Sequence, residues 1–280
     1  MTSDAASFRA FSGEHLDAAT RLSQQVRWPH RREDWQMALA LSNGCVAVAA
    51  DGRVIGTVLM TPYGQDAGTI NMVIVDEAER GKGLGRCLMQ QAMALAGERR
   101  LQLVATEDGL QLYEKLGFRR GGEIVQHQGH LAEAVAQPDA VRAATPDDIA
   151  VITALDIAAF GADRRDLIAH IASIGEFAVL ERQGRAAGFA ALRHFGRGLV
   201  IGPVVAFSSE DAKSLVAHFL AGRQGKFIRV DTGSETGLAP WLGGLGLDHV
   251  GGGIVMLRPA AGHTRRRAPT SFALASQAFG

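Results

Sequence analysis

The stretch Arg80-Gly81-Lys82-Gly83-Leu84-Gly85 joins an apolar, β-branched segment, Ile70 to Val75, to a segment with helical periodicity from Leu84 to Leu95. Such a junction predicts a strand, a glycine loop and a helix. A glycine loop that opens a helix presents unpaired backbone amides and the positive end of the helix dipole to one point. With Arg80, Lys82 and Arg86 adding positive charge, the stretch predicts a phosphate-binding site.

Two familiar phosphate-binding loops do not fit this stretch. A P-loop ends in Gly-Lys-Ser/Thr after four intervening residues, a pattern that the sequence lacks here. A dinucleotide fingerprint needs Gly or Ala where Arg86 stands, and it belongs to a parallel βαβ unit. Here the preceding segments, Cys45 to Ala50, Val54 to Thr61 and Thr69 to Val75, are separated by turn residues and predict an antiparallel meander.

The remaining match is to the GNAT acetyltransferase signature, Gln/Arg-x-x-Gly-x-Gly/Ala, which the chain resembles at Arg80, Gly83 and Gly85. A second element supports it, because the segment Leu112-Tyr113-Glu114-Lys115-Leu116-Gly117-Phe118 is similar to the family's Leu-Tyr-Glu-x-x-Gly-Phe motif and falls on a predicted short helix. The resemblance implies an α+β fold in which a mixed, mostly antiparallel sheet is flanked by helices.

The same resemblance implies acetyl-CoA as cosubstrate and no metal. The loop from Arg80 to Arg86 is expected to bind the CoA pyrophosphate. The backbone of Val73, Ile74 and Val75 is expected to pair with the pantetheine arm where this strand splays from its neighbour, Leu101 to Thr106. Thr106 is expected near the pantetheine without a chemical role.

Tyr113 stands where the family has its general acid, and it is the catalytic residue that the resemblance implies. The general base stays open. Many relatives place a glutamate in the strand before the loop, where this chain has Asn71, which could only order a water. Glu107, Asp108, His127 and His130 are further candidates by proximity in sequence alone.

The second half of the chain repeats the order of elements from Val141 onward. Leu245-Gly246-Leu247 corresponds to Leu116-Gly117-Phe118, at an offset of 246 − 117 = 129 residues. Where the glycine loop should recur, the chain reads Phe207-Ser208-Ser209-Glu210-Asp211. The pattern predicts an internal duplication whose second copy has lost its loop.

We therefore expect a catalytic GNAT domain at 1–132, a degenerate GNAT-like domain at 140–260 and a C-terminal tail at 261–280, as in bacterial tandem GNAT proteins. Whether the second domain walls the acceptor pocket or only stabilises the fold is open. In the tail, Phe272, Leu274 and Phe279 suggest docking on the protein near the domain cleft.

The composition limits the classes of partner that the protein is expected to bind. The formal net charge is +0, so no global field would gather nucleic acid or an anionic membrane. No apolar run approaches the ~18 residues of a membrane span, and Cys45 and Cys87 are predicted to be buried free thiols. These features indicate a cytoplasmic protein whose partners are small molecules, with no nucleic-acid or membrane partner. No pattern indicates an oligomeric state.

The sequence thus favours acetyl transfer from acetyl-CoA to a primary amine of a small molecule, by direct attack of the amine on the thioester. A non-catalytic acyl-CoA sensor or scaffold, or acetylation of a protein amine, remains an alternative.

Overall fold

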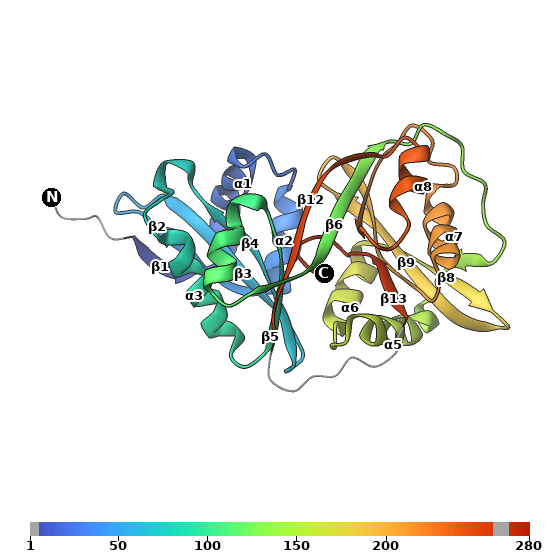
Figure 1. Ribbon diagram of the computed structural model, residues 1–280, viewed down its shortest axis with the longest axis horizontal. Coiled ribbons are helices and arrows are strands. Elements are labelled where there is room, and N and C mark those ends of the chain that lie inside the picture. The colour runs from blue at the N-terminus through green and yellow to red at the C-terminus, as the bar shows by residue number, and fades with distance from the viewer. Residues whose placement is uncertain (1–5, 260–268) are drawn as a thin grey trace.

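The structure is a computed structural model that describes residues 6–259 and 269–280. Its architecture is α+β, as expected: one mixed, mostly antiparallel sheet of 13 strands, in the order β1-β2-β3-β4-β5-β12-β6-β11-β13-β10-β9-β8-β7, with helices packed on its faces (Figure 1). No helix of the described residues is long and apolar enough to span a membrane.

The first half follows the predicted order of elements, preceded by an extra short edge strand that the pattern did not predict. Its elements are β1 (Ser7–Ala10), α1 (Leu16–Gln25), α2 (Arg32–Ala40), β2 (Asn43–Val48), β3 (Val54–Tyr63), β4 (Ala67–Val75), α3 (Leu84–Ala96), β5 (Arg100–Ala105), α4 (Leu110–Lys115) and β6 (Arg119–His130). Successive residues of β2 face opposite sides of the sheet: Val46 packs in the cluster with α1 and α2, and Ala47 in the cluster with α3.

The second half repeats this order. Its elements are β7 (Val141–Ala143), α5 (Ile149–Phe160), α6 (Arg165–Ile174), β8 (Gly175–Arg182), β9 (Arg185–Phe195), β10 (Gly198–Ala206), α7 (Ser209–Leu220), β11 (Phe227–Gly233), α8 (Ala239–Gly244), β12 (Asp248–Arg258) and β13 (Thr270–Ala273). The single helical region expected after Val141 is two helices, because Gly161 ends α5 in a left-handed conformation (φ 81°).

The two halves exchange strands at the centre of the sheet. Strand β12 lies between β5 and β6, and β6 pairs on its other edge with β11. Figure 1 shows β6 and β12 running side by side through the middle of the molecule. Strand β12 of the second half therefore pairs with β5 of the first, and β6 of the first half pairs with β11 of the second, so that the two halves share one continuous sheet.

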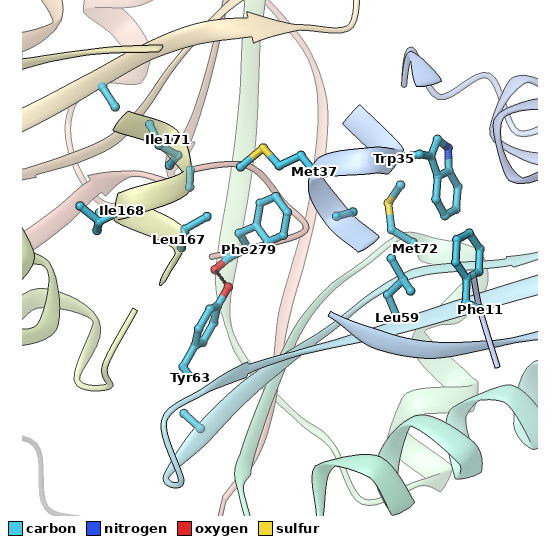
Figure 2. Close-up of a cluster of buried hydrophobic side chains, with 14 of the residues drawn as sticks. Phe11, Trp35, Met37, Leu59, Tyr63, Met72, Leu167, Ile168, Ile171 and Phe279 are labelled. Atoms are coloured by element: carbon cyan, nitrogen blue, oxygen red, sulfur yellow. Dashed lines mark hydrogen bonds between the residues drawn. The ribbon is translucent and has the colours of Figure 1, made fainter. Parts of the chain in front are cut away.

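An apolar cluster spans both halves and includes the C-terminal segment. Figure 2 shows Leu59 and Met72 of the first half, Leu167 and Ile171 of the second half, and Phe279 between them. The expected docking of the C-terminal segment is borne out for residues 269–280, in which Phe272 is 7% and Phe279 3% exposed. Residues 260–268 of the expected tail lie outside the described residues.

Both cysteines are free, as predicted, but only one is buried. Cys45, in β2, is buried in the core, whereas Cys87 is exposed on α3. The prediction of burial was wrong for Cys87, because its neighbours Leu88 and Met89 turn toward the sheet and leave it on the outer side of the helix.

Candidate active site

Strands β4 and β5 separate partway along their length. They pair in parallel only from Ala67 to Thr69 of β4 and from Arg100 to Gln102 of β5. Beyond this point β4 continues to Val75 with its other edge on β3. The edge of β4 that includes Val73, Ile74 and Val75 thus has free hydrogen-bonding groups available for an extended ligand.

A bulge reshapes β4 at the start of this gap. Thr57 opposes Ile74 and Leu59 opposes Asn71, so two residues, Met72 and Val73, stand opposite a single residue of β3. Met72 has a φ of 53°, which is uncommon for a residue with a side chain. The Thr57 hydroxyl donates a 2.7 Å hydrogen bond to the Met72 carbonyl, which helps to hold this backbone. The sequence did not reveal the bulge.

The glycine loop has the geometry of an anion cradle. Gly81 and Gly83 adopt left-handed conformations (φ 78° and 82°), and Gly83 is the N-cap of α3. Among the described residues, the backbone amides from Gly81 to Gly85 find no acceptor. Those unpaired amides and the N-terminus of α3 form a site for phosphate.

The three basic side chains of the loop differ in their surroundings. Arg80 and Arg86 are exposed, while the Lys82 ammonium forms a 2.8 Å ion pair with the Glu79 carboxylate. The two arginines are therefore the charges most available to an incoming phosphate.

Tyr113 lies on α4 and is buried, with 8% of its surface exposed. Burial raises the pKa of its hydroxyl to about 12, so the phenol stays protonated at neutral pH. Its ring covers Gly109, where an added Cβ would come within 2.6 Å of the ring. A glycine at this position lets the ring lie against the start of α4.

A cavity of about 450 Å³ opens beside the β4–β5 gap, between the two halves. The first half supplies Asn71 and Met72 of β4, and Thr106 just after β5. The α1–α2 connection and β6 of the first half also line it, and the other walls come from β12, the end of β9 and the turn after it, β11 and the C-terminal segment. The structure thus places Thr106 at this cavity, whereas Tyr113 and the glycine loop lie outside its lining.

Three polar atoms around this cavity have no hydrogen-bond partner. They are His30 Nδ1, Asn71 Oδ1 and Arg193 Nε, the only such buried side-chain atoms among the described residues. His30 and Asn71 line the large cavity, and His30 and Arg193 line a small one that adjoins it. Buried polar groups are almost always paired, so their concentration here indicates a ligand site.

His30 is a residue that the sequence reasoning missed. Its pKa is lowered to about 4, mainly by burial and further by the nearby charge of Arg229, so the imidazole is neutral at pH 7. Its ring packs edge-on against Phe195 of the second half at 5.2 Å. Nothing in the sequence near Trp28-Pro29-His30 signals this contact, because Phe195 lies more than half the chain away.

The bases proposed from sequence proximity do not reach the cavity. His127 donates through Nδ1 to the Leu247 carbonyl (2.8 Å), and His130 donates to the Gly225 carbonyl (2.9 Å). Gln126 and Gln128 of the same strand do line the cavity, and strand alternation turns His127 to the other face. Glu107 and Asp108 are exposed and do not belong to the lining.

The corresponding gap in the second half is filled by the chain itself. Strands β10 and β11 pair in parallel only at Leu199 and Val200, as β4 and β5 do at their start. Beyond, β13 pairs with β10 from Val204 to Ala206. At the start of α7, Ser208 accepts a hydrogen bond from the Asp211 amide, and two acidic residues occupy the first turn.

Comparisons with known proteins agree with this architecture. Two family profiles described as "Acetyltransferase (GNAT) domain" match residues 42–120 and 152–269. The chain is 30% identical over 229 residues to the uncharacterized N-acetyltransferase YitH of Bacillus subtilis, covering 79% of this chain and 80% of that protein.

Two solved structures share the fold over nearly the whole chain. A putative acetyltransferase from Pyrococcus horikoshii has a TM-score of 0.81 at 20% identity, covering 100% of this chain and 98% of that one. A tandem GNAT protein from the clavulanic acid biosynthesis pathway has a TM-score of 0.64 at 14% identity, covering 92% and 100%.

The chain therefore belongs to the GNAT family of N-acetyltransferases, with two GNAT domains in tandem. Membership implies an acyl-CoA cosubstrate, and the free strand edge, the unpaired loop amides and the adjoining cavity fit such a molecule.

Proposed function

We propose that the protein transfers the acetyl group of acetyl-CoA to a primary amine of a small molecule, with the cosubstrate bound by the first half alone. The observation that carries this proposal is the combination, in one half only, of a free β4 edge and a glycine loop with unpaired amides. In this proposal the pyrophosphate lies at the N-terminus of α3 between Arg80 and Arg86. The pantetheine arm pairs with Val73 to Val75.

The reacting centre lies at the inner end of the β4–β5 gap. Acetyl-CoA supplies an activated thioester. The amine forms the new C–N bond as the C–S bond breaks, and the strand amides beside the bulge at Met72 are suited to stabilise the charge that develops on the carbonyl oxygen. Tyr113 acts as the acid that protonates the departing thiolate, a role supported by its protonated state at neutral pH.

The amine must lose a proton before or during attack, because an alkylamine has a pKa near ~10.4. Asn71 Oδ1, an acceptor, and the ring nitrogen His30 Nδ1 are the atoms at the cavity that have no hydrogen-bond partner among the described residues. We assign them to positioning the amine, or the water that carries its proton away. His30 remains neutral and able to accept a hydrogen bond throughout the neutral range.

The second domain is proposed to be catalytically degenerate. Its β10–β11 gap is closed by β13, which occupies the place that a pantetheine arm takes in the first half. Glu210 and Asp211 in the first turn of α7 would repel a pyrophosphate. Its contribution is then to build one wall of the acceptor cavity, through Phe195, Arg197 and Arg229.

The experiment is to incubate the protein with acetyl-CoA and a panel of primary amines while following free thiol. We expect amine-dependent thiol release and an N-acetylated product by mass spectrometry. Saturable acetyl-CoA binding without amine-dependent release would instead identify an acyl-CoA sensor.

A further inference from the structure

We propose that the acceptor amine also carries an anionic group, a carboxylate or a phosphate, and that arginines of the second half bind it. The inference rests on the proposed function, because it names the acceptor class of that same site. It assigns a specific task to the domain that lacks a cofactor site.

The charge of the cavity points to such a ligand. Three arginines line it, Arg27, Arg197 and Arg229, and no aspartate or glutamate does so among the described residues. Arg27 and Arg197 are exposed, and neither forms an ion pair within residues 6–259 and 269–280. Opposite charges attract across such a site and like charges are excluded, so a polyamine fits it poorly.

Arg229 is held in a fixed orientation. It is 8% exposed, its Nε and Nη2 lie 2.9 and 2.8 Å from the Asp231 carboxylate, and its guanidinium stacks 4.9 Å from the Phe195 ring centre. The remaining Nη1 makes no hydrogen bond to a described residue. A guanidinium fixed in this way is preorganised for a carboxylate or phosphate oxygen.

Arg193 adds a buried charge without a carboxylate partner. It is 3% exposed, donates only to the carbonyls of His194 and Ala275, and keeps its Nε unpaired. Its guanidinium carbon lies 5.2 Å from the centre of the same Phe195 ring that Arg229 contacts. The nearest carboxylates, Asp34 and Asp231, are engaged by Arg31 and Arg229 instead. A buried cation that no carboxylate contacts is costly, and an anion bound near Phe195 would compensate its charge.

Unusual backbone conformations at the cavity also support a ligand-binding site. Among the described residues, non-glycine positive φ angles occur at Arg27, Met72 and Gln183. The first two line the cavity, and strained backbone that persists at a pocket is a sign of function.

The test compares matched acceptors that differ only in charge. Thiol release is measured with L-amino acids and their carboxamides, with amino sugar phosphates and the parent amino sugars, and with linear polyamines. We expect kcat/KM to be about 10- to 100-fold higher for the anionic member of the preferred pair, the ratio that one charge-assisted hydrogen bond supplies. A higher kcat/KM for amino acids than for their carboxamides would identify a carboxylate, and a higher value for amino sugar phosphates than for amino sugars would identify a phosphate.

Two variants test the arginines while keeping a positive charge beside Asp231. Arg197→Gln removes an exposed charge, and Arg229→Lys keeps a cation beside Asp231 but loses the planar fork. Each should lower the anionic-to-neutral ratio at least severalfold. Arg185→Gln removes an exposed arginine at the β8–β9 turn of the same half and should leave the ratio unchanged.

A binding readout separates this inference from the proposed function. With CoA in place of acetyl-CoA, the anionic amines should raise the melting temperature and their neutral partners should not. No thiol release with any amine, together with this thermal shift, would sink the proposed function and support the anion site. Equal turnover of acids and carboxamides, preference for polyamines, or a ratio unmoved in both arginine variants would overturn the inference alone.

Discussion

The Tyr63 hydroxyl donates a 2.7 Å hydrogen bond to the Phe279 carbonyl oxygen, across 216 residues of sequence, as the dashed line in Figure 2 shows. Arg164, itself fully buried against Asp156, donates to the same carbonyl at 3.1 Å. The C-terminal segment is thereby fixed between β3 of the first half and the helices of the second. The contact also steadies the neighbouring residues, Ser276 to Ala278, which line the acceptor cavity.

This relationship predicts a graded loss of stability. Phe279→Ala should lower the free energy of unfolding by about 3–5 kcal/mol, because it empties a buried site in the shared core. Tyr63→Phe should cost only about 1 kcal/mol, since the carbonyl keeps its bond to Arg164. Chemical denaturation checks both values, and a Phe279→Ala protein as stable as the parent would contradict the docking of this segment.

The glycine loop predicts a separable effect on cosubstrate binding. Gly83→Ala places a side chain in a left-handed conformation with open space around it, which costs roughly 1–2 kcal/mol and disturbs the amides at the N-terminus of α3. Gly52→Ala is the matched control, because Gly52 has a φ of 87° and is equally unobstructed. Calorimetry should show weaker CoA binding for the Gly83 variant only. Equal CoA affinity in the two variants would show that the glycine loop is not part of the CoA site.

The role proposed for Tyr113 predicts a loss of turnover with binding preserved. Tyr113→Phe should lower kcat by roughly a hundredfold or more and leave CoA affinity nearly intact. Because the pKa of Tyr113 is raised to about 12, its ionisation should produce no fall in kcat below about pH 11. An unchanged kcat in the phenylalanine variant would exclude Tyr113 as the acid.

The partly buried His30 predicts a pH dependence of stability. Its pKa is about 4 in the folded protein and 6.5 when unperturbed, so the unfolded state binds the extra proton between these values. The stability that the neutral ring contributes is present above pH 6.5 and is lost as the pH falls to 4, on the order of 1 kcal/mol per pH unit.

His30→Gln should flatten the stability profile in that window, whereas His194→Gln, which removes an exposed histidine, should not. Urea denaturation between pH 4 and 7 provides the measurement. Parallel profiles for the parent and the His30 variant would show that His30 is not held neutral by the fold.

Local sequence signals predicted much of the fold and little of the acceptor site. Apolar, β-branched stretches and turn residues were enough to predict β2, β3 and β4, and the glycine pattern was enough to predict the loop at Gly81 and Gly83. Both kinds of feature depend on residues that are neighbours in sequence. The exchange of β6 and β12 depends on pairings between distant strands, which no local pattern encodes.

The same limit applies to the cavity. His30 contacts Phe195, and Asn71 and Arg229 line one cavity, only after the halves pack together. Proximity in sequence favoured His127 instead, but a one-residue step along β6 turns its side chain to the opposite face of the sheet from Gln126.

The central claim is that only the first half binds the cosubstrate, and the stoichiometry of CoA binding to the intact chain tests it most directly. Isothermal titration should give one CoA per chain, because the free β4 edge and the glycine loop occur once, and β13 closes the second gap. A stoichiometry of two would contradict the account.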